Sequence, residues 1–239
     1  MQFEIISQTD EKIVVHLKKT TVAFANALRR AVINRLPSFA INEVDFYENN
    51  SPFYNEYLAN RLGMIPLTFE ENVAGDAKIS LTLNASGPGM VYSKDIVSTD
   101  EAVKPLNGNF PIVDLGEGQN VRLEAWAVQG NALQHAKFQS AIASYTNYAK
   151  FELKKTAGTK EFLASLPKKV FDEKGEVNPW YAELVEEYLE ENPEAGSFEY
   201  KDDEFIFFVE SYNNVSALAK LRAALETIKK EAGEIKKEF

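Results

Sequence analysis

The carboxyl-terminal end of this chain constrains its fold more than any other part. Residues 205–209 (FIFFV) form a continuous apolar run, which is typical of a strand buried on both faces. Asn214 or Ser216 can cap the helix predicted after it, and apolar residues recur along that helix at spacings of three, four or seven. These residues are Val215, Leu218, Leu221, Leu225, Ile228 and Ile235. Both the strand and the apolar stripe have to cover another surface, so this end of the chain needs partners from elsewhere.

The amino-terminal end supplies the natural partners. Residues 3–7 and 13–17 alternate apolar and polar side chains around a polar turn, which predicts a hairpin. The threonine pair at 20–21 can cap a helix that runs to about Leu36 and is ended by Pro37. A further strand is predicted over residues 40–47. We therefore expect this hairpin and helix to pack with the terminal strand and helix.

The amino-terminal helix has two different faces. Phe24 and Leu28 recur at helical spacing and form a narrow apolar face. Arg29 and Arg30 lie on the opposite face. Two adjacent charges on a short helix usually mean a solvated surface, and an arginine fork can also hold carboxylates or carbonyls at an interface.

The middle of the chain begins with a short polar segment that interrupts the preceding pattern. Pro52 and the polar cluster at 49–51 mark a domain boundary. A short helix is predicted over residues 55–62, with Gly63 at its C′ position. Alternating segments between residues 79 and 127 then predict a β-rich region.

An acidic segment follows the β-rich region. Asn178 caps a helix predicted over residues 180–191, whose expected apolar stripe is Trp180, Leu184 and Tyr188. Residues 181–204 hold ten Asp or Glu and one Lys, so this segment carries much of the net charge.

Composition excludes several classes of site. The chain has no cysteine, which excludes disulfides, thiolate metal sites, iron–sulfur clusters and cysteine nucleophiles. His16 and His135 are its only histidines, too few for a metal site with three or four ligands. The net charge of −10 repels phosphate backbones, so we expect little or no direct contact with nucleic acid. With neither a signal peptide nor an apolar run of about 20 residues, we expect a cytoplasmic protein without membrane contact.

No set of residues predicts catalysis. Residues 116–118 (GEG) lack the third glycine and the following helix of a nucleotide-binding turn. The carboxylates form no pair in a context that suggests general acid–base chemistry. We expect no catalytic residue. A free-standing soluble enzyme built on Glu or His residues remains the rival interpretation.

Five blocks of the sequence resemble one known family. The first two are residues 24–30 (FANALRR) and 54–67 (YNEYLANRLGMIPL). The others are residues 87–96 (GPGMVYSKDI), parts of 111–125, and 135–139 (HAKFQ). In this order they resemble the α-like subunits of multisubunit RNA polymerases, most closely the archaeal D-type branch. Kin of that branch are the eukaryotic third-largest subunit and the amino-terminal domain of bacterial α.

The resemblance implies an α+β fold with a discontinuous layout. Residues 1–48 and 199–239 would form a dimerisation domain, a sheet plus two helices. Residues 49–198 would form a β-rich inserted domain. Within it, residues 152–196 resemble a degenerate ferredoxin-like insertion. In its motif remnant, residues 166–171 (LPKKVF), Leu166 stands where a ligand cysteine would precede the proline, so we expect no cofactor.

The resemblance also implies partners. Family members act as assembly scaffolds for transcription and contribute no residue to nucleotidyl transfer. They pair helix against helix with a small α-like subunit, of the archaeal L type, whereas bacterial relatives pair with themselves. They also dock the second-largest subunit and small accessory subunits. A bacterial-like homodimeric α subunit is therefore a second alternative.

The resemblance assigns two sets of site residues. The implied dimer interface is Phe24, Leu28, Val215, Leu218, Leu221, Leu225 and Ile228. The implied large-subunit docking surface is Asn26, Arg29, Arg30, Glu56, Arg61, Gly63, His135 and Lys137.

Overall fold

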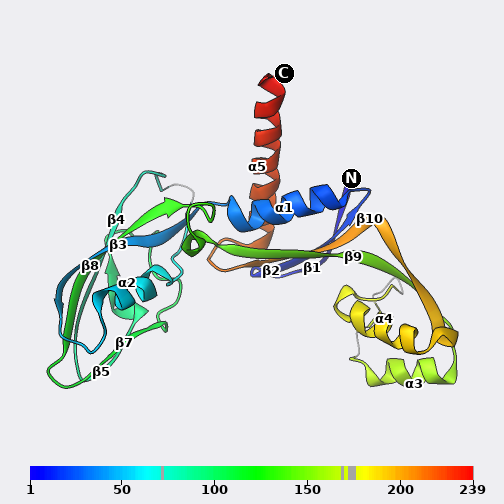
Figure 1. Ribbon diagram of the computed structural model, residues 1–239, viewed down its shortest axis with the longest axis horizontal. Helices are drawn as coiled ribbons and strands as arrows, with labels where there is room; N and C mark the ends of the chain where they lie inside the picture. The colour runs from blue at the N-terminus through cyan, green and yellow to red at the C-terminus, as the bar shows by residue number, and fades with distance from the viewer. Residues whose placement is uncertain (71–72, 168–169, 172–175, 239) are drawn as a thin grey trace. The chain divides into compact units, whose positions relative to one another are not determined.

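The computed structural model describes residues 1–70, 73–167, 170–171 and 176–238 (Figure 1). Lys168 and Lys169 of the predicted motif remnant, and residues 172–175 of the ferredoxin-like segment, lie outside the described residues. The mixture of helices and antiparallel sheets confirms the predicted α+β class. Among the described residues, none of the helices combines the length and apolar character needed to cross a membrane.

The chain divides into two compact units. Unit 1 comprises Met1–Ser7, Val14–Asn26 and Ser144–Phe208. Unit 2 comprises Gln8–Ile13, Ala27–Ala143 and Val209–Phe239. The predicted split into a dimerisation domain and an inserted domain is a different partition of the chain, and it stays a prediction.

A four-stranded sheet joins the two ends of the chain. Its order is β1-β2-β10-β9, with β1 at Gln2–Gln8, β2 at Lys12–Lys18, β9 at Ala141–Leu153 and β10 at Gly196–Ser211. The adjacency of β1 and β2 confirms the predicted hairpin, and β10 lies beside β2 as expected. Phe205, Ile206, Phe207 and Val209 are each at most 2% exposed, which confirms the predicted burial at these positions, whereas Phe208 is half-buried.

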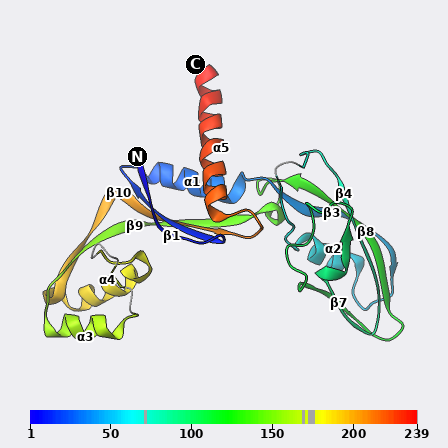
Figure 2. The same ribbon diagram turned by 180° about the vertical axis from the view of Figure 1, so that it is seen from behind.

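Two long helices lie near opposite ends of the chain. Helix α1 spans Val22–Asn34, and the amide of Phe24 donates to Thr21 Oγ1 at 3.3 Å, so Thr21 caps it as predicted. Helix α5 spans Ala217–Glu238 and is the terminal helix visible in both views (Figures 1 and 2).

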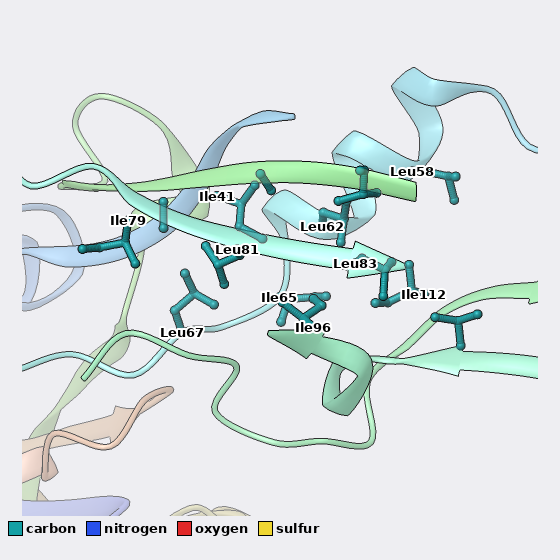
Figure 3. Packing of buried hydrophobic residues seen from close by; sticks show 14 of the residues in the cluster. Ile41, Leu58, Leu62, Ile65, Leu67, Ile79, Leu81, Leu83, Ile96 and Ile112 are labelled. Carbon is teal, nitrogen blue, oxygen red and sulfur yellow. The ribbon is translucent and has the colours of Figure 1, made fainter. Parts of the chain in front are cut away.

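A large hydrophobic core lies in unit 2. Its main sheet has the order β3-β8-β4-β6, with β3 at Ser38–Asn49, β4 at Ile79–Ser86, β6 at Ile96–Ser98 and β8 at Asn120–Gly130. A second pair consists of β5 (Gly89–Tyr92) and β7 (Pro111–Leu115). Helix α2 (Asn55–Gly63) contributes Leu58 and Leu62 to one cluster with Leu81 and Leu83 of β4 (Figure 3). Short 3-10 turns follow at Ser93–Asp95 (η1) and Ala136–Phe138 (η2).

A smaller core in unit 1 corrects one expectation. Helices α3 (Ala157–Ser165) and α4 (Ala182–Glu191), with the 3-10 turns η3 (Pro179–Tyr181) and η4 (Pro193–Ala195), pack beside β9 and β10 (Figure 1). The buried residues of α4 are Val185 and Leu189. Trp180 is 56% and Leu184 43% exposed, so the predicted stripe through them is wrong. Trp180 belongs to η3, because α4 begins two residues later than expected, and α4 packs through Val185 and Leu189.

Candidate functional site

The arginines predicted for docking are placed by the buried face of α1. Leu28 is fully buried, together with Ala25, Ala31 and Val32 of the same helix. Burial of that face leaves Arg29 half-buried and Arg30 exposed. Asn26 and Phe24 are also half-buried. The helix therefore presents a cationic edge next to a packed apolar face.

Arg61 makes contacts with other residues of this chain. Its Nη2 donates to the carbonyl of Pro111 at 2.5 Å, and its guanidinium lies 5.8 Å from the ring centre of Tyr57. The hydrogen bond ties α2 to β7, and the contact with Tyr57 lies within α2. Glu56, in the first turn of α2, is exposed, where its charge favours the positive end of the helix. The docking role of Glu56 and Arg61 stays a prediction.

Gly63 does not stop α2 in the expected way. It is the last residue of the helix, and the cap is Met64, whose φ of −90° and ψ of −7° are right-handed. The glycines with positive φ in the described residues are Gly89, Gly118 and Gly196. The C′ prediction for Gly63 is therefore wrong, and a Cβ there would meet the carbonyl of Ile41 at an ordinary 3.5 Å.

The predicted block at His135 forms an ordered turn against β3. His135 Nδ1 accepts from the amide of Lys137 at 3.1 Å, which assigns the proton of the neutral ring to Nε2. Lys137 Nζ donates to Asn42 Oδ1 at 2.8 Å. Asn42 lies at a register shift of β3, and such a bulge re-aims a side chain. Burial lowers the pKa of the Lys137 ammonium.

Gly130 makes that turn possible. A Cβ at this position would lie 2.8 Å from two ring atoms of Phe138, which is 5% exposed. Ser38 Oγ in turn donates to the backbone carbonyl of Phe138 at 2.5 Å, which ties the backbone of the turn to the first residue of β3. Because Gly130 has no side chain, the Phe138 ring can pack against its backbone, and the turn that carries Lys137 lies close to β8.

We expect Gly130→Ala to lower the free energy of unfolding by about 1–3 kcal/mol, since overpacking forces neighbours out of place. Denaturant unfolding of the full chain measures it. Gly233→Ala is the matched control, because a Cβ there meets nothing within 4 Å on an exposed helix. That control should be neutral or stabilising by up to about 1 kcal/mol. Equal stability of Gly130→Ala and the wild type would contradict the close-packing argument.

A pocket of about 540 Å³ joins two sequence blocks that lie far apart in the chain. Met64, Pro66 and Leu67 line it from the segment after α2, and Lys137 lines it from the turn at η2. Met64 is 66% exposed, which is high for a large apolar side chain. Among the described lining residues, Lys137 alone is charged. The pocket suits an apolar side chain with a neighbouring hydrogen-bond acceptor.

The pocket gathers only part of the predicted docking set. Lys137 lines it, whereas Glu56, Arg61, Gly63 and His135 do not. Arg29 and Arg30 lie on α1, outside the pocket lining.

Sequence reasoning missed a buried lysine next to this pocket. Lys220 of α5 is 3% exposed, and its Nζ donates to Ser140 Oγ at 2.7 Å. Burial lowers the pKa of its ammonium to about 8. The available signal was its position, three residues after Ala217 and four before Ala224, both fully buried.

The stripe of α5 is only partly covered. Leu221 is 4% exposed, and Lys220 and Ala224 of the same helix are buried as well. Leu218, Leu225 and Ile228 are half-buried, Ile235 is 59% exposed, and Val215 packs against the unit 2 core. Further along α5, Glu231 forms an ion pair with Arg35. The predicted interface role of these residues stays a prediction, and the uncovered side of the stripe is the surface available for it.

Comparisons with known proteins agree on one family. The RNA polymerase Rpb3/RpoA insert domain family matches residues 44–145. The DNA-directed RNA polymerase subunit Rpo3 of Pyrococcus furiosus is 41% identical over 71% of this chain and 67% of its own length. That of Thermococcus kodakarensis is 40% identical, over 70% and 67%. That of Methanosarcina mazei is 31% identical over 98% of this chain and 97% of its own.

Proposed function

The chain belongs to the Rpo3 family of DNA-directed RNA polymerase subunits, and from that premise we propose that it is a non-catalytic assembly scaffold. The observation that carries the proposal is the uncovered side of the α5 stripe. Leu218, Leu225 and Ile228 stay half-buried and Ile235 stays exposed, although the helix buries its other side. An apolar stripe left open on a monomer marks a protein interface.

The proposed occupant of that stripe is a small α-like subunit of the archaeal L type. Leu218, Leu221, Leu225 and Ile228 alternate spacings of three and four, which is the seam along which two helices pack. Leu221 lies in line with the seam but is 4% exposed, so it packs within this chain and leaves Leu218, Leu225 and Ile228 for the partner. The helix thus covers its own fold with one side and meets the partner with the other.

The proposed platform for the second-largest subunit combines the cationic edge of α1 with the 540 Å³ pocket of unit 2. Exposed Arg30 offers a planar fork for carboxylates or carbonyls, and exposed Met64 offers an apolar contact. Small accessory subunits would bind elsewhere on the same scaffold. The role needs no cofactor and no residue in nucleotidyl transfer, and a transcription complex acts in the cytoplasm.

We expect the double charge reversal Arg29→Glu/Arg30→Glu to weaken binding of the second-largest subunit by about tenfold or more, since charge-assisted contacts are lost and repulsion is introduced. Pull-down at equal concentrations, with the small α-like subunit present, measures it. Lys154→Glu/Lys155→Glu is the matched control, because it reverses two adjacent exposed charges elsewhere. Equal binding by all three proteins would refute the proposed platform.

A further inference from the structure

A second cavity, in unit 1, has walls of a different kind. It measures about 410 Å³ and lies among β9, β10, η3 and the start of α4. Aromatic side chains line it from three elements, namely Tyr148 of β9, Trp180 of η3, and Tyr200 and Phe208 of β10. Glu183 and Glu186 line it from α4. The cavity therefore combines flat π-faces with carboxylates.

Ring contacts hold the aromatic side chains of the cavity in place. Trp180 meets Phe208 edge to face at 5.3 Å between ring centres, and Tyr148 stacks on His16 at 4.3 Å. Trp180 nevertheless stays 56% exposed and Tyr200 46% exposed. Much of the indole and phenol surface is thus held in place and left uncovered.

The charges around the cavity are negative. The Tyr200 hydroxyl donates to Glu186 Oε2 at 2.9 Å, and the Tyr148 hydroxyl donates to Glu176 Oε2 at 3.2 Å. The hydrogen bond to Glu186 is the largest cause that raises the pKa of Tyr200, with smaller contributions from burial and from Glu183 and Glu190. A carboxylate has about four acceptor sites, so Glu186 keeps capacity for a further donor.

We propose that this cavity binds an arginine side chain presented by a basic segment of a partner protein. A guanidinium is planar, stacks on the face of a tryptophan or tyrosine, and donates two parallel hydrogen bonds to a carboxylate. The cavity offers both contacts at once, through Trp180 and Tyr200 and through Glu183 and Glu186. The surrounding segment 181–204, with ten acidic residues and one lysine, attracts a basic peptide and repels an acidic one.

This cavity is separate from the surfaces proposed for polymerase assembly. The cavity lies wholly within unit 1, whereas the docking pocket and the α5 stripe lie in unit 2. The two can therefore fail independently.

The test is an NMR titration of the full chain with the peptide acetyl-Gly-Arg-Gly-Arg-Gly-amide. The chain has two tryptophans, so it gives two indole signals, and Trp126→Phe assigns the remaining one to Trp180. We expect a saturable shift of the Trp180 signal only. The peptide with citrulline for arginine, which keeps the shape and removes the charge, should bind about tenfold more weakly. The lysine peptide should also bind more weakly, because it lacks the planar fork.

Two double variants separate a built site from general surface charge. Glu183→Gln/Glu186→Gln removes both lining carboxylates and should weaken binding of the arginine peptide by about tenfold or more. Glu187→Gln/Glu191→Gln removes the same charge from the same helix outside the cavity lining and should leave binding close to that of the wild type.

Several outcomes would overturn the proposal. They are no shift of Trp180, equal weakening by both double variants, or equal binding of the arginine, lysine and citrulline peptides. The dispersion of the amide spectrum checks that each variant is folded. Trp180→Leu, read by calorimetry, is a second variant that should also lose the arginine preference.

Discussion

Leu225→Asp/Ile235→Asp should abolish pairing with the small α-like subunit while the chain stays folded. Both residues belong to the open side of the α5 stripe, since Leu225 is half-buried and Ile235 is 59% exposed. The double variant removes two apolar anchors from the helix seam and places two carboxylates there, whose desolvation on binding costs free energy. We therefore expect at least about 100-fold weaker binding. Size-exclusion chromatography with light scattering on the co-expressed pair measures the loss.

Two further variants separate interface from core. Ala219→Asp/Gly233→Asp adds the same charge at exposed positions of α5 outside the stripe, and it should leave pairing intact. Leu221→Asp, at a position 4% exposed, should instead lower the free energy of unfolding by several kcal/mol. If Leu225→Asp/Ile235→Asp keeps its partner, the stripe is not the interface. If it unfolds like Leu221→Asp, the stripe is ordinary core.

Lys220→Met should stabilise the chain at neutral pH by about 1–3 kcal/mol. The wild type buries an ammonium whose described partner is the Ser140 hydroxyl, and burial lowers its pKa from 10.5 to about 8. Methionine fills a similar volume without a charge to desolvate. The shift of pKa sets an upper value of about 3 kcal/mol for the gain.

The gain should depend on pH with a defined sign. Below pH 8 the lysine is protonated in both the folded and unfolded states, so the penalty is present in full. Between about pH 8 and 10.5 the unfolded state binds more protons, so wild-type stability rises with pH and the gap to Lys220→Met closes. Denaturant unfolding at pH 7, 9 and 10 measures this. Lys229→Met, at an exposed position, should show no such closure. A Lys220→Met protein less stable than the wild type at pH 7 would contradict the account.

Local patterns predicted the elements that depend on neighbours in sequence. Most of the apolar run at 205–209 is buried in a strand, and Thr21 caps α1. Both were predictable because strand burial and helix capping depend directly on the type of side chain. The exposure of Trp180 and the helical position of Gly63 were missed. Both depend on where a helix begins or ends by one or two residues, which the sequence specifies least.

Long-range features could not be predicted from local patterns. Lys220 is buried because Ser140, 80 positions earlier, comes to lie against α5. Met64 and Lys137 line one pocket although they lie far apart in sequence, and the pairing of β3 with β8 sets another lining residue, Ser38, opposite Gly130. The resemblance to a family assigned Lys137 a role, and the structure adds its partner Asn42 and its place in the pocket.

The most direct test of the scaffold proposal is the mass in solution of this chain co-expressed with the small α-like subunit of the same genome. The account predicts a stable one-to-one heterodimer. A well-behaved monomer that ignores the small subunit would contradict the account and favour a free-standing enzyme. A homodimer that ignores it would contradict the proposed partner and favour the arrangement of bacterial α.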